Sequence, residues 1–148
     1  MADIGSFEKL QRRDNELGAK TTYEHFLAKE GMPAVRGFHI EDINAVELYP
    51  WARMGGRGVY LNLDGSEGVN DCYIAEIAAG KALEPQRHMF EELIYVVSGH
   101  GATTVWQDGG KKQSFEWGEG ALFSPPLNVW YQHFNGAGVP SRRNSWCS

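Results

Sequence analysis

A series of short apolar segments with a period of two residues begins after Gly58, and it constrains the fold more than any other feature of the sequence. Alternation of this kind places one set of side chains on each face of a β-strand. Turns rich in glycine, proline and aspartate separate the segments, and Asp108-Gly109 is a strong hairpin signal. Strands this short and this regularly interrupted predict an all-β fold, an antiparallel barrel or sandwich. The expected strands are residues 59–63, 72–78, 93–97, 103–107, 113–117, 121–123 and 129–134.

The residues before these segments predict one short helix. Thr21 and Glu24 have the spacing of a capping box, and Gly31 with Pro33 supplies a stop signal. We therefore expect a helix near residues 22–30. The chain is accordingly divided into an N-terminal extension with this helix (1–57), a barrel core (58–135) and a C-terminal tail (136–148).

The C-terminal tail is rich in glycine, serine, arginine and asparagine and shows no alternation. These residues are poor strand formers, so we expect residues 136–148 to be irregular. The strand at 129–134 would then have an incompletely covered neighbour, and an exposed strand edge favours association with another chain. A tail of this kind also fits a chain that is a shortened relative of a longer, two-barrel protein.

Composition excludes several classes of partner. A net charge of −5 on 148 residues argues against nucleic acid, which requires a concentrated positive patch. No apolar run approaches the roughly 20 residues that a membrane-spanning helix needs. Cys72 and Cys147 provide neither a disulfide framework nor a zinc-ligand spacing, so we expect two free thiols in a reducing cytoplasm.

Residues 80–99 contain three polar side chains that are expected to lie close together. Gln86 and His88 are two residues apart on a strand and therefore point in the same direction. Glu92 shares its phase with apolar residues, which predicts an inward carboxylate. An inward imidazole and carboxylate are costly to bury unless they share a ligand, a proton or a metal. A polar pair that joins the barrel walls without any further function explains the same spacing.

Residues 118–135 contain a second pair of this kind. Tyr131 and His133 are two residues apart and share a strand face. The turn at Pro125-Pro126 fixes how the chain enters this strand, because proline presets φ. Aromatic residues at the rim of a β-barrel would give the same pattern without forming a site.

The two stretches together resemble the paired motifs of the cupin superfamily. The first motif of that family runs Gly, five residues, His-x-His, three or four residues, Glu, six residues, Gly. The second, a glycine-rich turn, a proline and then a histidine with an asparagine four residues later, resembles residues 118–135. The resemblance covers residues 58–135 and implies an antiparallel cupin barrel, jelly-roll-like, around a small-molecule pocket. The positions that match the first motif are Gly80, Gln86, His88, Glu92 and Gly99.

This sequence departs from the cupin pattern at two ligand positions. Cupins with the full pattern hold iron, manganese, nickel or zinc with three histidines and a glutamate. Here Gln86 replaces the first histidine and Tyr131 replaces the third. His133 could complete a set of two histidines and one carboxylate with His88 and Glu92. The resemblance therefore implies a divalent metal on His88, Glu92 and His133, with Tyr131 and Gln86 as catalytic hydrogen-bond donors.

The function implied by the resemblance is a metal-dependent, oxygenase-like enzyme with a small-molecule substrate. The Trp130-x-x-His133 pattern also looks like that of ring-cleaving dioxygenases of the gentisate type. One alternative is a metal-free barrel that binds a small ligand. Another is a half-barrel that depends on a second chain. Many cupins pair as homodimers, which the resemblance implies here as well.

Overall fold

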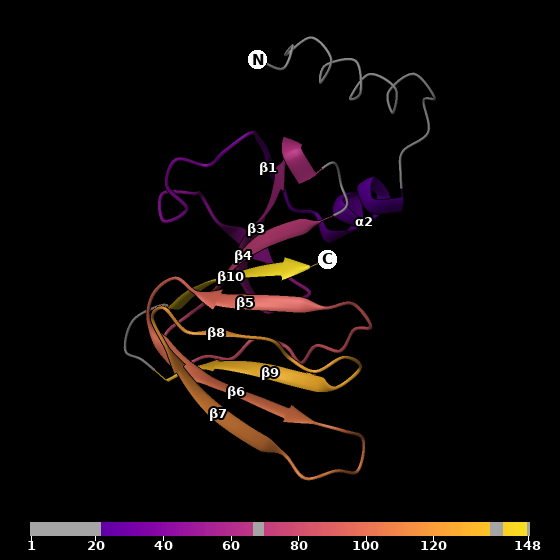
Figure 1. Ribbon diagram of the computed structural model, residues 1–148, viewed down its shortest axis with the longest axis vertical. Helices are drawn as coiled ribbons and strands as arrows, with labels where there is room; N and C mark the ends of the chain where they lie inside the picture. The colour runs from indigo at the N-terminus through magenta and orange to yellow at the C-terminus, as the bar shows by residue number, and fades with distance from the viewer. Residues whose placement is uncertain (1–21, 67–69, 137–140, 148) are drawn as a thin grey trace.

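The computed structural model describes residues 22–66, 70–136 and 141–147, the last of these by its backbone. One short helix and two β-sheets make up these residues, and Figure 1 shows the larger sheet above the smaller one. The elements in chain order are α2 (Thr22–Glu30), β1 (Ala34–Gly37), β2 (Tyr49–Trp51), β3 (Gly56–Leu63), the 3-10 turn η1 (Asp64–Ser66), β4 (Asp71–Ile77), β5 (Glu92–Val96), β6 (His100–Trp106), β7 (Gln113–Gly118), β8 (Leu122–Phe123), β9 (Trp130–Asn135) and β10 (Ser141–Cys147).

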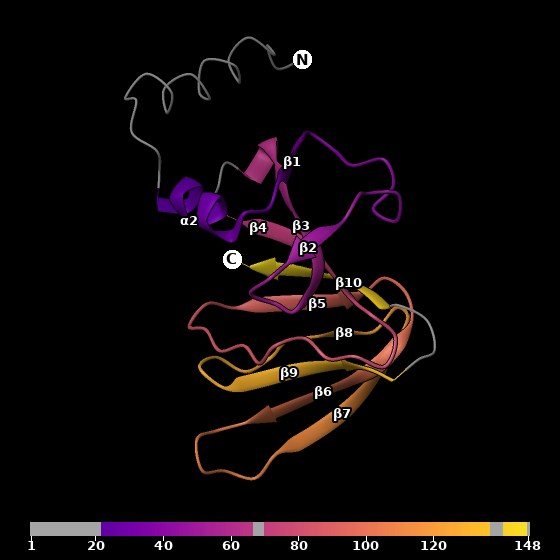
Figure 2. The same cartoon turned by 180° about the vertical axis from the view of Figure 1, so that it is seen from behind.

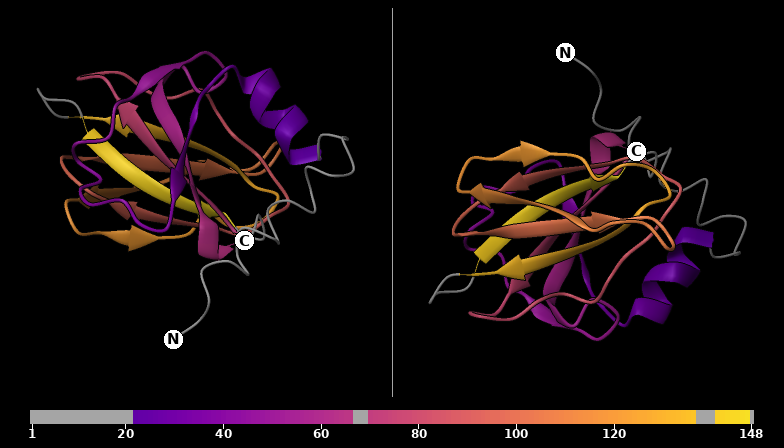
Figure 3. Two further views of the ribbon diagram at one scale, coloured as in Figure 1. Left: turned by 90° about the horizontal axis from the view of Figure 1, so that it is seen from above. Right: turned by 90° about the horizontal axis from the view of Figure 1, so that it is seen from below.

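The strand order confirms the expected all-β architecture with one short N-terminal helix. The larger sheet runs β1-β3-β4-β10-β5-β8, with β2 paired to β3, and the smaller sheet runs β7-β6-β9. All pairs are antiparallel except β1 with β3. Views from the back and from both ends show the two sheets closing around a common interior (Figures 2 and 3).

The interior is filled by large apolar side chains from both sheets and from α2. Trp51, Tyr60 and Tyr73 pack edge to face, with ring centroids 5.1–6.0 Å apart. Leu27 is the residue that α2 buries against this core. Within the described residues, no helix has the length and hydropathy that crossing a bilayer would require.

The expectation of an irregular C-terminal tail is wrong for residues 141–147. They form β10, which lies between β4 and β5 and pairs with both (Figure 1). A central strand has backbone hydrogen-bonding partners on each side, and this tertiary pairing outweighs the poor strand propensity of the sequence. The C-terminal segment therefore supplies a central strand, which joins the two halves of the larger sheet.

The predicted uncovered neighbour of the 129–134 strand is also wrong. One edge of β9 pairs with β6, and the other is covered by residues 81–86. Gln86 and Tyr131 exchange two backbone hydrogen bonds of 2.9 Å, and Leu83 N–H donates to the carbonyl of His133. The extended segment that leads into the first motif thus satisfies the backbone groups of this edge.

Cys72 allows a test of the packing on β4. Burial, followed by the nearby Asp71 carboxylate, raises the pKa of the Cys72 thiol to about 12. Since the thiolate is the reactive form, its population near neutral pH is roughly a thousandfold lower than for an ordinary cysteine. In a Cys147→Ser variant we expect Ellman's reagent to react with the folded protein at least about 100-fold more slowly than with the urea-unfolded protein. Rates within tenfold of each other would contradict this packing.

Candidate functional site

The centre of the candidate site is the carboxylate of Glu92, which is the first residue of β5. Alternation along β5 turns this side chain inward, and its exposed fraction is 1%. Tyr73 of β4 donates its phenol proton to Oε1, and Tyr131 of β9 donates to Oε2 at 2.7 Å. Tyr73 belongs to the larger sheet and Tyr131 to the smaller one, so the carboxylate links both walls of the barrel. Charge-assisted bonds of this type are stronger than neutral ones.

His88 completes a triangle of polar atoms with this carboxylate. Its Nε2 lies 2.9 Å from the Tyr131 hydroxyl and 3.2 Å from Glu92 Oε2. Its Nδ1 lies 2.8 Å from the carbonyl oxygen of Phe90. Because a carbonyl can only accept, Nδ1 carries a proton and Nε2 faces the centre. The Phe90 ring stacks on the imidazole with centroids 3.8 Å apart, and the His88 side chain is 15% exposed.

His133 lies behind Tyr131 and belongs to a second buried chain of hydrogen bonds. Trp117 Nε1 donates to Thr103 Oγ1 at 2.9 Å, and Oγ1 lies 2.7 Å from His133 Nδ1. Thr103 Oγ1 accepts from the indole, and its contact with His133 engages Nδ1 in either tautomer of the ring.

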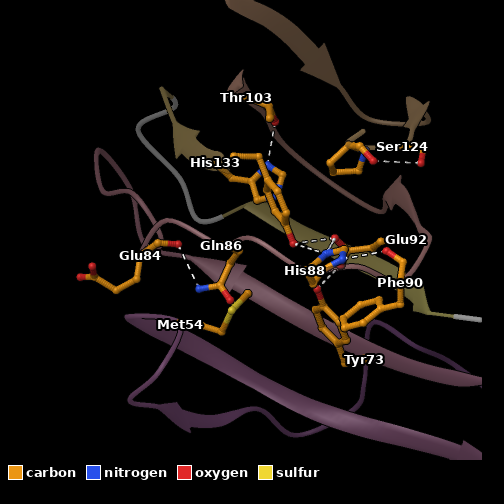
Figure 4. A network of polar contacts seen from close by, with 12 residues as sticks. Met54, Tyr73, Glu84, Gln86, His88, Phe90, Glu92, Thr103, Ser124 and His133 are labelled. Carbon is orange, nitrogen blue, oxygen red and sulfur yellow. Dashed lines mark hydrogen bonds and ion pairs between the residues drawn. The ribbon is translucent and has the colours of Figure 1, made fainter. Parts of the chain in front are cut away.

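Gln86 does not hydrogen-bond to the Glu92 centre. Its Oε1 accepts from Arg53 at 2.6 Å, and its Nε2 donates to the carbonyl of Glu84. Figure 4 shows the amide beside Met54 and Glu84, away from Glu92. Arg53 is held in turn by Glu30 of α2 at 2.8 Å. Burial lowers the pKa of Arg53, but the contacts with Glu30 outweigh it and the net shift is upward, so the guanidinium stays charged.

The structure thus brings together three of the residues singled out from sequence, His88, Glu92 and Tyr131. Tyr131 and His133 are both 2% exposed, which rules out a position on the rim. Sequence reasoning missed Tyr73, because a tyrosine within a strand of apolar residues is expected to be part of the hydrophobic core. Its role depends on the register of β4 against its neighbours, and the local pattern carries no signal for that register.

The donor set does not fit a divalent metal held by three ligands. Among the described residues, no three His, Cys, Asp or Glu side chains gather as a group that could hold one. Both Glu92 oxygens accept phenol protons, and Nδ1 of His133 is engaged by Thr103. Nε2 of His88 is the imidazole nitrogen that contacts Glu92 and Tyr131. Neutral phenols are weak ligands for iron, manganese or zinc.

Comparison with known proteins gives the same architecture. No protein-family model matches the chain, and no curated protein matches it. Among solved structures, the Cnp3 cupin domain of Schizosaccharomyces pombe matches 72% of this chain and 71% of its own length, with 15% identity and a TM-score of 0.60. Oxalate decarboxylase of Lactobacillus farciminis, solved as a formate complex, matches 71% of this chain with 20% identity and a TM-score of 0.57.

A vicilin from hazelnut, Corylus avellana, matches 69% of this chain with 16% identity and a TM-score of 0.57. The match spans 30% of the vicilin chain and 31% of the oxalate decarboxylase chain. Matches at sequence identities this low support a shared fold but not a shared activity. Together with the strand order and the motif spacing around Glu92, they show that the fold of this chain is that of the cupin superfamily.

Proposed function

We propose that this cupin binds a small, uncharged polar molecule at the Glu92 centre without a resident metal. The observation that carries the proposal is the hydrogen bonding of the carboxylate, which accepts one phenol proton on each oxygen. These donors stabilise the buried negative charge in the way that a cation would. A barrel that satisfies its carboxylate with its own tyrosines has no need of a metal for that purpose.

The charge at the centre favours an uncharged ligand. Two anions in a region of low dielectric repel each other strongly, so a carboxylate or phosphate ligand beside Glu92 is disfavoured. Arg53, the guanidinium that contacts Gln86, is already held by Glu30. An uncharged molecule with two donor hydrogens can instead enter between Tyr131 and His88 and donate to Nε2 and to the phenol oxygen, whose own proton is given to Glu92.

The ring of Phe90 covers one face of His88. His88 is the member of the triangle with the largest exposed fraction, and Phe90 stacks on it while remaining 47% exposed itself. A ligand that approaches the imidazole from this face therefore meets the phenyl ring first. Rotation of one partly exposed side chain is a fast motion, so the site can open without rearranging the sheets.

The test uses acetamide and acetate, which have nearly the same size and differ in charge. In ¹H–¹⁵N spectra of protein labelled at histidine, acetamide should shift the His88 signals with a dissociation constant in roughly the millimolar range, as expected of a fragment this small. Acetate should cause at least about tenfold less saturation at equal concentration, because of its charge. One equivalent of Zn²⁺ should leave the His88 signals unchanged.

Two variants serve as controls for this titration. Tyr131→Phe removes one of the two acceptors and should weaken acetamide binding by about tenfold or more. The double variant Gln86→His/Tyr131→His restores histidine at the two positions where this sequence differs from the cupin ligand pattern, and it should bind Zn²⁺. Acetate binding as tightly as acetamide, or stoichiometric zinc in the wild-type protein, would overturn the proposal.

A divalent-metal-dependent, oxygenase-like enzyme is the second candidate function. It is favoured by His88 Nε2 and Glu92 Oε2, which lie 3.2 Å apart and face the same centre. These are the two positions at which the sequence keeps the ligand types of metal-binding cupins. Stoichiometric zinc or manganese in protein purified without an affinity tag would support this candidate over the first.

A further inference from the structure

A hollow lies on the outer side of the larger sheet, under the loop of residues 38–48 that joins β1 to β2. This loop packs on the outward side chains of β3 and β4 and forms a second core with Val59, Leu61 and Ile74. Figure 2 shows the loop at the end of the molecule that lies away from β6 and β7. The hollow measures about 350 Å³, which is within the size range of small-molecule sites. Of the described residues that line it, none belongs to the Glu92 centre.

The walls of this hollow are mainly apolar. The loop and the two strands supply them in equal number: Phe38, Ile40 and Ile43 from the loop, and Leu61, Leu63 and Cys72 from β3 and β4. Phe38 is 63% exposed and Leu61 is 4% exposed, so the walls run from solvent down to the second core. Such walls favour a ligand with an apolar body, because the gain from removing apolar surface from water grows with its area.

Asp71 is the acidic side chain that lines this hollow. Its Oδ1 accepts hydrogen bonds from Asn62 at 2.8 Å and from the backbone N–H of Cys72 at 2.9 Å. Its Oδ2 accepts from the Tyr23 hydroxyl at 2.6 Å. A carboxylate has about four acceptor positions, so the contacts made within the described residues leave one position on Oδ2 for a further donor.

The negative charge of Asp71 is only partly compensated. No basic side chain among the described residues forms an ion pair with it, and Arg36 acts on it more weakly than its hydrogen bonds do. Burial raises the pKa of Asp71, and the hydrogen bonds lower it without cancelling that effect. The covering loop adds Glu41, Asp42 and Glu47 and carries no lysine or arginine. A cation beside Asp71 would therefore be attracted both by this carboxylate and by the loop.

We infer that the hollow under the 38–48 loop binds a small molecule with an apolar body and one protonated amine. The body packs between the loop and the outer side of β3, and the ammonium donates to Oδ2 of Asp71. Charge-assisted hydrogen bonds of this kind are roughly twice as strong as neutral ones. Because the hollow shares no lining residue with the Glu92 centre, the inference stands or falls independently of the function proposed for that centre.

Three molecules of similar size and different charge test the ligand class on the full chain. They are 2-phenylethylamine, which is cationic at pH 7, 2-phenylethanol, which is neutral, and phenylacetate, which is anionic. In ¹H–¹³C spectra of protein labelled at the isoleucine δ1 methyl groups, 2-phenylethylamine should shift Ile40 and Ile43 with a dissociation constant of about 1 mM or lower. The alcohol should bind at least about tenfold more weakly, and phenylacetate more weakly still. Ile94, an inward residue of β5 near Glu92, should keep its signal.

Asp71→Asn keeps the shape of the side chain and removes its charge. This variant should weaken binding of the amine by at least about tenfold and leave binding of the alcohol within about twofold of the wild type. Asp42→Asn is the matched control, because Asp42 is an exposed residue of the same loop that does not line the hollow. Its effect on the amine should stay below about twofold, since exposed charges are screened by salt. Leu63→Trp fills the hollow and should abolish the shifts with both ligands, which keeps the test valid if Asp71→Asn does not fold.

Three results would overturn the inference. The first is phenylacetate or 2-phenylethanol binding as tightly as the amine. The second is an unchanged affinity for the amine in folded Asp71→Asn or folded Leu63→Trp. The third is the absence of shifts at Ile40 and Ile43 with about 10 mM amine, including the case in which Ile94 shifts instead and the amine occupies the barrel interior.

Discussion

Replacing Glu92 by alanine is expected to destabilise the fold by about 3–5 kcal/mol. The change removes the acceptor from two buried phenols, Tyr73 and Tyr131, and leaves both hydroxyls without their charged partner. It also opens a cavity at the start of β5, and a cavity adds to the cost of the lost contacts. Urea unfolding at pH 7, followed by tryptophan fluorescence, measures the loss directly.

The neighbouring Glu91→Ala variant is the matched control for this experiment. Glu91 is exposed, so its replacement should change stability by less than about 0.5 kcal/mol. Tyr73→Phe should fall between the two, at about 1–2 kcal/mol, because Glu92 keeps its bond from Tyr131. Equal and small effects for Glu91 and Glu92 would show that the carboxylate does not link the two sheets.

The same atoms of His88 and Glu92 join the two sheets and form the proposed ligand site. A polar pair that only joins the barrel walls would be dry and closed. Here the triangle joins both sheets through Tyr131 and Tyr73, yet His88 keeps 15% exposure under a single phenyl ring. The proposed ligand site is therefore the exposed corner of a network that also stabilises the fold, so loss of binding must be measured on variants shown to be folded.

The strands from β3 to β9 were predictable because short runs rich in apolar residues are separated by turn signals, and β5 and β9 also alternate between a buried and a more exposed face. The same alternation located the inward phase of Glu92 and the shared face of Tyr131 and His133. The helix at residues 22–30 was predictable from its capping box and its glycine stop. These signals are local, and local signals are what a single sequence carries most directly.

The features that sequence reasoning missed depend on contacts between distant segments. β10 is polar and does not alternate, and it is a strand because β4 and β5 both pair with it. Tyr73 of β4 contacts Glu92 of β5 because of the register with which both strands pair with β10. Gln86 is held by Arg53, 33 residues earlier in the chain, and so does not join the centre that its motif position implies. None of these pairings leaves a periodic trace in the sequence.

Gly101→Ala is expected to cost about 3 kcal/mol or more, the second-largest effect among the variants considered. A methyl group at Gly101 would overlap the carbonyl oxygen of Phe134 on the paired strand β9 and approach Trp117 Cη2 to 2.6 Å. The backbone oxygen cannot move without breaking the β6–β9 pairing. Displacing Trp117 would in turn break its bond to Thr103, on which the orientation of His133 depends.

Gly118→Ala is the control, because Gly118 lies in the neighbouring strand β7 and a methyl group there meets no atom within 4 Å. That variant should unfold within about 1 kcal/mol of the wild type. Thermal and urea unfolding of both variants give the comparison, and the ¹⁵N signals of His133 report whether the Trp117–Thr103–His133 chain has moved. If Gly101→Ala is as stable as Gly118→Ala, then β6 and β9 are not packed as closely as the structure has them. The hydrogen bond between Thr103 and His133, which argues against His133 as a third metal ligand, would then be unsupported. Zinc binding by the wild-type protein would decide that point.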